Sequence, residues 1–142
     1  MINTDKVRYA LRERLLNAGI ITGDNDFHGE NLPSLTISNQ PFWIDEYWGG
    51  HTSRPWSAMR RRIMLCLMRY DIYVPKGTGT LMLSEKQSAI ELEFDILDDT
   101  RSNVLADGIT VTVYRISVSE DVEDKNWRIR PVTLFLRCTA HI

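Results

Sequence analysis

The chain has 142 residues, the length of one ordinary domain, so we expect a single domain over residues 1–142. Hydrophobic residues make up 43% of the sequence and charged residues 25%, a balance that is typical of globular proteins and excludes a wholly disordered chain. The formal net charge of −2 gives no general attraction to nucleic acid or to an acidic membrane surface.

The compartment is indicated by the cysteines and by the N-terminus. Cys66 and Cys138 lie in apolar segments, and a disulfide framework would show more cysteines at closer spacing, so we expect two buried free thiols. No apolar run approaches the roughly 20 residues that a membrane helix needs. Residues 1–16 carry charges too early for a signal peptide. These features predict folding in a cytoplasm and no membrane partner.

The first predicted element is an amphipathic helix over residues 4–18. Thr4 is a suitable N-cap, and Val7 and Leu11 begin an apolar series at helical spacing. Gly19 follows where a left-handed residue usually ends a helix. A helix that is apolar on one side and charged on the other must pack that apolar side against another layer.

The next segment is predicted to be mostly irregular. Residues 21–34 are a loop by composition, and a short strand follows at 35–37. Residues 43–56 are aromatic but turn-rich. Gly49-Gly50 and Arg54-Pro55 within this segment argue against a long regular element.

Two interpretations compete for residues 58–69. Ile63, Leu65 and their neighbours alternate as in a buried strand, but alanine, methionine, arginine and leucine are also good helix formers. The β-branched and aromatic residues at 70–74 favour a strand. We therefore predict a strand over residues 58–74.

A second helix and two further strands complete the predicted fold. The helix follows a glycine pair, contains Ser84 and Gln87 at capping-box spacing, and ends between residues 94 and 97. Residues 109–116 and 127–139 alternate as strands and are expected to form an antiparallel hairpin. The fold class is therefore α+β, with a four-stranded, mostly antiparallel sheet and two helices packed on one of its faces.

The glycine pair lies in the sequence YVPKGTGTLMLS (residues 73–84), which resembles a phosphate-binding loop. A Walker-type loop needs its lysine after the glycines, but Lys76 precedes Gly77. The dinucleotide pattern needs a third glycine, and Met82 occupies that position. We therefore expect the glycines to serve a turn, and we predict no nucleotide cofactor.

No set of catalytic or metal-binding residues can be assembled from the sequence. Cys138 and His141 form a pair with no evident further zinc ligands. The acidic residues around Asp95 and Asp98 lack the order of a calcium loop, and a helix end with its following turn explains them. The sequence predicts no metal, no cofactor and no enzyme activity.

Arginine and aromatic residues gather between positions 42 and 62. Three interpretations remain open: a protein interface, a solvated face that pairs with acids such as Asp45 and Glu46, and a nucleic-acid surface. The acidic total charge places the protein interface first and the nucleic-acid surface third. The predicted interface residues are Trp43, Tyr47, Trp48, Arg54, Trp56, Arg60, Arg61 and Arg62.

The order of these segments resembles the tail terminator (tail-tube completion) proteins of long-tailed bacteriophages. The similarity begins with the helix KVRYALRERLLNAGI and continues with the sequence Asn39-Gln40-Pro41-Phe42. It then includes YDIYVPKGTGT, which leads into a helix ending around Phe94, and the closing hairpin from Ile109 to Thr139.

The resemblance implies a structural virion protein that forms a homohexameric ring. Such a ring caps the tail tube and offers a surface for head-tail joining. The implied partners are further copies of the chain, the major tail-tube protein and a head-completion or connector protein, with DNA only as cargo passing through the lumen. The implied location is the head-proximal end of the virion tail, after assembly in the host cytoplasm. The alternatives are another head-tail connector protein and a small nucleic-acid-binding module.

Overall fold

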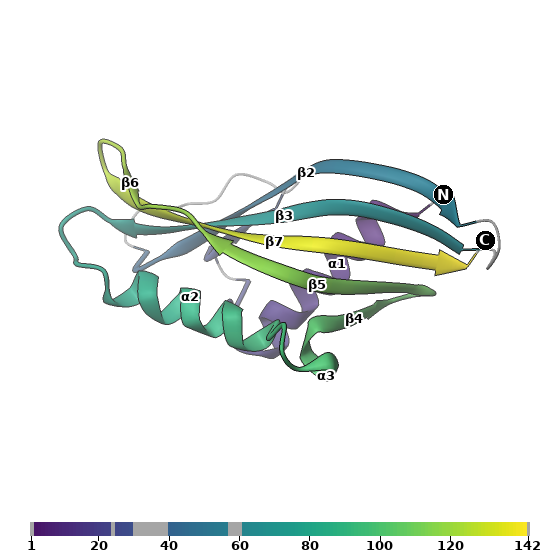
Figure 1. The fold of residues 1–142 in the computed structure, drawn as a ribbon. Coiled ribbons are helices and arrows are strands. Elements are labelled where there is room, and N and C mark those ends of the chain that lie inside the picture. The colour runs from purple at the N-terminus through teal and green to yellow at the C-terminus, as the bar shows by residue number, and fades with distance from the viewer. Residues whose placement is uncertain (1, 24, 30–39, 57–60, 142) are drawn as a thin grey trace.

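The computed structural model describes residues 2–23, 25–29, 40–56 and 61–141 (Figure 1). The elements in chain order are α1 (Thr4–Asn17), β1 (Phe27–His28), β2 (Trp43–Trp56), β3 (Arg61–Pro75), α2 (Leu81–Glu93), α3 (Asp99–Ser102), β4 (Asn103–Ala106), β5 (Ile109–Val118), β6 (Val122–Glu123) and β7 (Trp127–His141).

The strands form one curved sheet. Its order is β1-β2-β3-β7-β5-β4, and β6 pairs with β7 outside this path. Every pairing is antiparallel except that of β1 with β2. Figure 1 shows the long strands β2, β3, β7 and β5 lying side by side and curving together. The sheet is therefore mixed, with a single parallel pairing at its β1 edge.

The core lies between the two longer helices and one face of the sheet. Side chains alternate between the two faces of a strand, and the even-numbered residues of β3 from Met64 to Val74 are buried. The apolar sides of the helices cover these residues. The core side chains supplied by α1, α2 and the residue after α2 are Val7, Leu11, Leu15, Leu83, Ile90 and Phe94.

A buried ion cluster attaches α1 to β2. The Glu46 side chain is fully buried, and its Oε1 accepts hydrogen bonds from Nε of Arg8 at 3.2 Å and Nη2 of Arg8 at 3.1 Å. Nη2 of Arg12 lies 3.4 Å from both Glu46 oxygens. A buried charge is tolerated only when it is paired, so this cluster fixes the position of the helix over the strand.

The glycine pair at residues 77 and 79 lies in the connection from β3 to α2. The N–H of Thr78 donates to the Pro75 carbonyl at 3.3 Å, and Gly77 has φ of 90°. Lys76 has no positive φ, so residues 75–78 form a type II turn. Such a turn requires a left-handed residue at its third position, which is occupied by Gly77. Gly79 also has positive φ, at 85°. The glycines are required by the turn that leads from the sheet to the helix.

The predicted number of strands and helices is wrong, although the α+β class is retained. The sheet has seven strands rather than four, and the helices number three rather than two within the described residues. The strands that were not predicted as such include β1 and β6, with two residues each, and β4, with four. Such short strands hold too few residues for an alternating pattern to appear.

The largest correction concerns residues 43–56, which form a 14-residue strand. The register with β3 shifts between Gly49 and Thr52, so the glycines lie at an irregularity of the strand rather than at its end. Among the described strands, only β1 pairs with the other side of β2, and it does so at Ile44 and Asp45. Proline is tolerated near the sheet edge, where the missing N–H breaks no ladder bond. Pro55 therefore does not end the strand.

Other sequence predictions are confirmed. The first helix ends at Asn17, although its N-cap is Asn3, whose Oδ1 accepts from the N–H of Asp5 at 3.0 Å. The disputed segment is a strand from Arg61, and β5 pairs antiparallel with β7. The two cysteines are free and buried. The strand predicted at residues 35–37 and the start of the strand at 58–60 lie outside the described residues.

Candidate interaction surface

The face of the sheet opposite the helices is the main candidate surface. The odd-numbered residues of β3 point to this face, and Leu65, Leu67, Arg69 and Tyr73 are half-buried there. No helix among the described residues packs on this side, because α1 and α2 contribute to the core on the other. We call it the open face. Within the described residues, its half-buried apolar side chains are screened only in part, by their neighbours on the strands.

Three aromatic rings form a cluster at one end of the open face. Trp43 stacks on Tyr73, its register partner, with ring centroids 3.9 Å apart. Trp127 meets both rings edge-on, at 6.0 Å from Trp43 and 6.3 Å from Tyr73. Offset stacks and edge contacts are the favourable geometries for aromatic rings. The cluster joins β2, β3 and β7 into one rigid surface.

Two carboxylates lie opposite each other beside this cluster. Asp45 of β2 and Asp71 of β3 are direct register partners, and both are buried. Like charges directly opposite on a sheet destabilise it, so each needs a counter-charge or hydrogen-bond donor. His28 Nδ1 lies 2.9 Å from Asp45 Oδ1, and the Tyr47 hydroxyl donates to Asp45 Oδ2 at 2.8 Å. The Asp45 carboxylate is therefore held on two sides.

Asp71 is less well compensated than Asp45. Nη2 of Arg69 donates to its Oδ2 at 3.2 Å. Nε of Arg69 lies 2.9 Å from Oδ1 but is not directed at it, so neither atom gains a hydrogen bond. Burial is the main cause that raises the pKa of Asp71 above its ordinary value, with Arg69 opposing the rise and Asp45 adding to it.

The two tyrosines beside these carboxylates are held in their neutral form. Burial and the hydrogen bond to Asp45 raise the pKa of the Tyr47 phenol, and burial with the charges of Asp45 and Asp71 raises the pKa of Tyr73. The guanidinium carbon of Arg69 lies 4.4 Å from the centre of the Tyr47 ring. This network fixes the orientation of Tyr47, whose ring is exposed.

The centre of the open face is basic. Phe135 of β7 pairs with Leu67 of β3 on one side and with Arg115 of β5 on the other. The guanidinium carbon of Arg115 lies 4.9 Å from the centre of the Phe135 ring. Arg137, two residues further along β7, is exposed. Within the described part of the chain, neither Arg115 nor Arg137 forms an ion pair, so both charges are available to a partner.

The predicted interface residues divide between the two faces. Trp43 and Tyr47 lie on the open face, as described above. Trp48 instead packs against the core, and Arg62 is half-buried with its Nε enclosed and without a hydrogen bond in the described structure. An interface role for this set stays a prediction.

For three other predicted residues only the strand position is described. Arg54 pairs with Ile63, and Trp56 pairs with Arg61. Arg60 lies outside the described residues. The structure therefore brings only part of the predicted set onto one surface.

Sequence reasoning missed several open-face residues, namely Asp71, Arg115, Trp127, Phe135 and Arg137. A strand that is buried on one side alternates with a period of two, and β7 shows this pattern from Val132 to Cys138. The alternation identifies Phe135 and Arg137 as residues of the second face once the core positions are known. Their adjacency to Arg115 depends on the register between strands.

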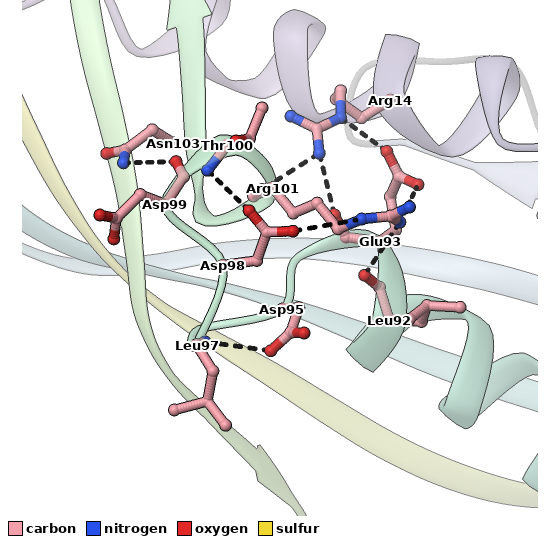
Figure 2. Close-up of polar contacts among 10 residues, drawn as sticks. All are labelled: Arg14, Leu92, Glu93, Asp95, Leu97, Asp98, Asp99, Thr100, Arg101 and Asn103. Carbon is pink, nitrogen blue, oxygen red and sulfur yellow. Dashed lines mark hydrogen bonds and ion pairs between the residues drawn. The ribbon is translucent and has the colours of Figure 1, made fainter.

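The acidic residues after α2 serve a turn. Asp95 Oδ1 accepts from the N–H of Leu97 at 3.0 Å, and Asp98 Oδ1 accepts from the N–H of Thr100 at 2.9 Å (Figure 2). Asp98 is the N-cap of α3. Among the described residues, no group of three histidine, cysteine or acidic side chains is arranged to hold a metal ion. These contacts agree with the interpretation of a helix end and its turn.

None of the described helices is both long enough and apolar enough to span a bilayer.

Comparison with known proteins informs the fold. No protein-family model matches the sequence, and no curated protein matches it. Twenty-five chains of solved structures are similar. One of them has a TM-score of 0.66 and 17% sequence identity, over 97% of this chain and 96% of that chain. At this identity the likeness shows the fold alone: the arrangement of sheet and helices is one that an experimentally solved protein also adopts.

Proposed function

We propose that this chain is a structural subunit of a phage tail, a tail terminator that assembles as a ring on the end of the tail tube. The open face carries the proposal. It combines exposed and half-buried rings, available arginines and an ordered polar network, which are features of protein interfaces. The specific role of a tail terminator is supported by the order of the sequence segments, which resembles that of the tail terminator family.

The proposed mechanism is geometric rather than chemical. Each subunit offers surfaces to its neighbours, to the tail-tube protein and to a head-completion protein. A stable contact buries roughly 800 Å² on each partner. The aromatic cluster of Trp43, Tyr73 and Trp127 is rigid before binding, so little conformational entropy is lost when it is covered.

Light scattering of the purified chain, alone and with purified tail tubes, tests this function. We expect a ring-sized mass, either for the free chain at high concentration or for the chain bound to the tube ends. Electron microscopy of the same mixture should show additional density at one end of each tube. A strict monomer that also fails to bind tubes contradicts the proposal.

The two alternative functions give different results in the same experiments. A head-tail connector would form a ring but would not bind isolated tail tubes. A nucleic-acid-binding module would show salt-dependent quenching of tryptophan fluorescence by an oligonucleotide, because Trp43 and Trp127 lie on the open face. Tube binding without quenching by oligonucleotide is the result that we expect.

A further inference from the structure

An apolar cluster lies at the end of α2, on the side away from the core. Leu97 is 91% exposed, Leu92 61% and Ile96 45%, while Ile90 and Phe94 in the same segment are fully buried. The three exposed residues, Leu92, Ile96 and Leu97, line a surface hollow of about 550 Å³ together with Ile116 of β5. Its other lining residues include two acids, Glu91 and Asp95, and no base. We call the set of Glu91, Leu92, Asp95, Ile96 and Leu97 the acidic corner.

The acidic corner is held in place by hydrogen bonds (Figure 2). The backbone of Asp98 donates to the Asp95 carbonyl at 3.0 Å, in addition to the bond from Leu97 to the Asp95 side chain. Arg101 donates to the Leu92 carbonyl at 3.3 Å. An exposed leucine on an ordered turn loses little entropy when a partner covers it, so the corner is suited to binding.

The same turn is also connected to α1. Nε of Arg14 donates to Glu93 Oε1 at 2.7 Å, and Nη2 of Arg14 donates to the carbonyls of Glu93 at 2.9 Å and Arg101 at 3.1 Å. Figure 2 shows Arg14 reaching from the helix to the Glu93 side chain and to the backbone of the turn. The turn that carries the apolar side chains of the corner is therefore attached to both α1 and α2.

The basic centre of the open face has the complementary properties. It offers the charges of Arg115 and Arg137, and the half-buried apolar side chains of Leu65, Leu67 and Phe135. We call these five residues the basic strip. The apolar residues of the corner could pack against the apolar residues of the strip. The carboxylates of the corner are opposite in charge to Arg115 and Arg137, which have no acidic partner within the described chain.

We propose that the acidic corner of one copy packs on the basic strip of the next copy. This inference rests on the proposed ring and names the surfaces that form it. The corner and the strip are different surfaces of the same chain, so their contact is heterologous, and repeated heterologous contacts close a ring when the rotation allows. Opposite charge selects the register, and burial of Leu97 supplies apolar contact.

Charge reversal on each surface tests the contact. Glu91→Arg reverses an exposed corner residue whose side chain accepts a hydrogen bond from Gln87, and Arg137→Glu reverses the strip. We expect each variant alone to self-associate at least about tenfold more weakly by sedimentation velocity, because like charges then meet. An equimolar mixture of the two variants should recover association, since each restores the complement that the other lacks.

Matched controls separate this effect from damage to the fold. Glu120→Arg reverses an exposed acid in the loop between β5 and β6 and should leave association unchanged. Leu97→Ala should weaken association, whereas Leu81→Ala, which truncates a 72% exposed leucine at the other end of α2, should not. Circular dichroism of every variant verifies folding.

The outcomes distinguish this contact from the proposed function. If the parent chain assembles and both reversed variants assemble equally well, the corner-to-strip contact is wrong while the ring stands. A mixture that fails to recover association also overturns the contact. If the parent chain neither self-associates nor oligomerises on purified tail tubes, both the contact and the proposed function are overturned.

Discussion

Asp71 is the residue at which the open face departs most from ordinary packing. It is 6% exposed, lies directly opposite Asp45, and leaves its Oδ1 without a hydrogen bond in the described structure. A buried carboxylate of this kind destabilises the isolated subunit when it is ionised. Functional surfaces often retain such unfavourable groups.

The Asp71→Asn variant should change the pH dependence of stability. Burial raises the pKa of Asp71 in the folded state, so the folded chain binds more protons than the unfolded chain between the ordinary value of 3.8 and the folded pKa. The free energy of unfolding due to this group therefore falls as pH rises towards the folded pKa, and the loss persists above it. The variant should gain stability relative to the parent at pH 7 and less at pH 3, measured by urea unfolding.

Asp107→Asn provides a control of opposite sign. The hydrogen bond from Lys6, at 2.6 Å, lowers the pKa of this exposed carboxyl. Asp107 therefore stabilises the fold above its unfolded pKa, and this contribution is lost as pH falls through the folded pKa. Asp107→Asn should not gain stability at pH 7. A pH profile of Asp71→Asn that is parallel to that of the parent contradicts the assignment.

At the scale of elements, two turns position the strands and helices around the core. The loop Asp107-Gly108 joins β4 to β5 with φ of 43° and 83°, the two positive values of a type I′ hairpin turn. The type II turn after β3 has one such residue, Gly77. It directs the chain from the centre of the sheet into α2, whose far end carries the acidic corner. The turn thus links the core strand to the proposed contact.

Gly77→Ala should destabilise the subunit by about 1–2 kcal/mol, because a residue with a Cβ is strained in the left-handed region. No atom lies within 4 Å of the added Cβ, so the loss would come from the backbone alone. Gly49→Ala is the matched control, with an ordinary φ and a Cβ 3.7 Å from Leu67 Cδ1, and should stay within about 0.5 kcal/mol of the parent. Equal losses of unfolding free energy in the two variants would show that the turn does not depend on glycine.

At the scale of the whole molecule, opposite charges are divided between two separate surfaces, the basic strip and the acidic corner. The open face presents Arg115 and Arg137, while the helix side ends in the acidic corner. The formal net charge of only −2 conceals this division. A molecule with opposite charges on different surfaces is suited to head-to-tail association, in which each copy adds to the last in the same orientation.

Self-association of the chain should therefore weaken as sodium chloride is raised from 0.1 M to 1 M. The Debye length falls from about 10 Å to about 3 Å over this range, which screens exposed ion pairs. A contact made by apolar side chains alone would be unaffected or strengthened by salt. Light scattering at constant protein concentration measures the change. Association that increases with salt would contradict an electrostatic corner-to-strip contact.

The elements that the sequence predicted well are those with local signals. The helix from Thr4 and the strands β5 and β7 each contain enough residues to display a period of 3.6 or 2. The position of Lys76 before the glycines argued for a turn, and the observed geometry fits that reading. The length of β2 was mispredicted, because glycine and proline normally interrupt regular structure, yet a register shift and a position near the sheet edge accommodate them here.

The sequence by itself determined the α+β class, both longer helices and the closing hairpin, because these depend on the spacing of neighbouring residues. Only the tertiary structure decided the composition of the surfaces. Asp45 meets Asp71, and Arg115 meets Phe135, through the exact register between paired strands, which the sequence pattern of each strand leaves open. Trp48 faces the core although its neighbour Tyr47 lies on the open face, since adjacent residues of a strand point to opposite sides. Period and turn chemistry are local properties, whereas a binding surface is defined by which strands pair and in which register.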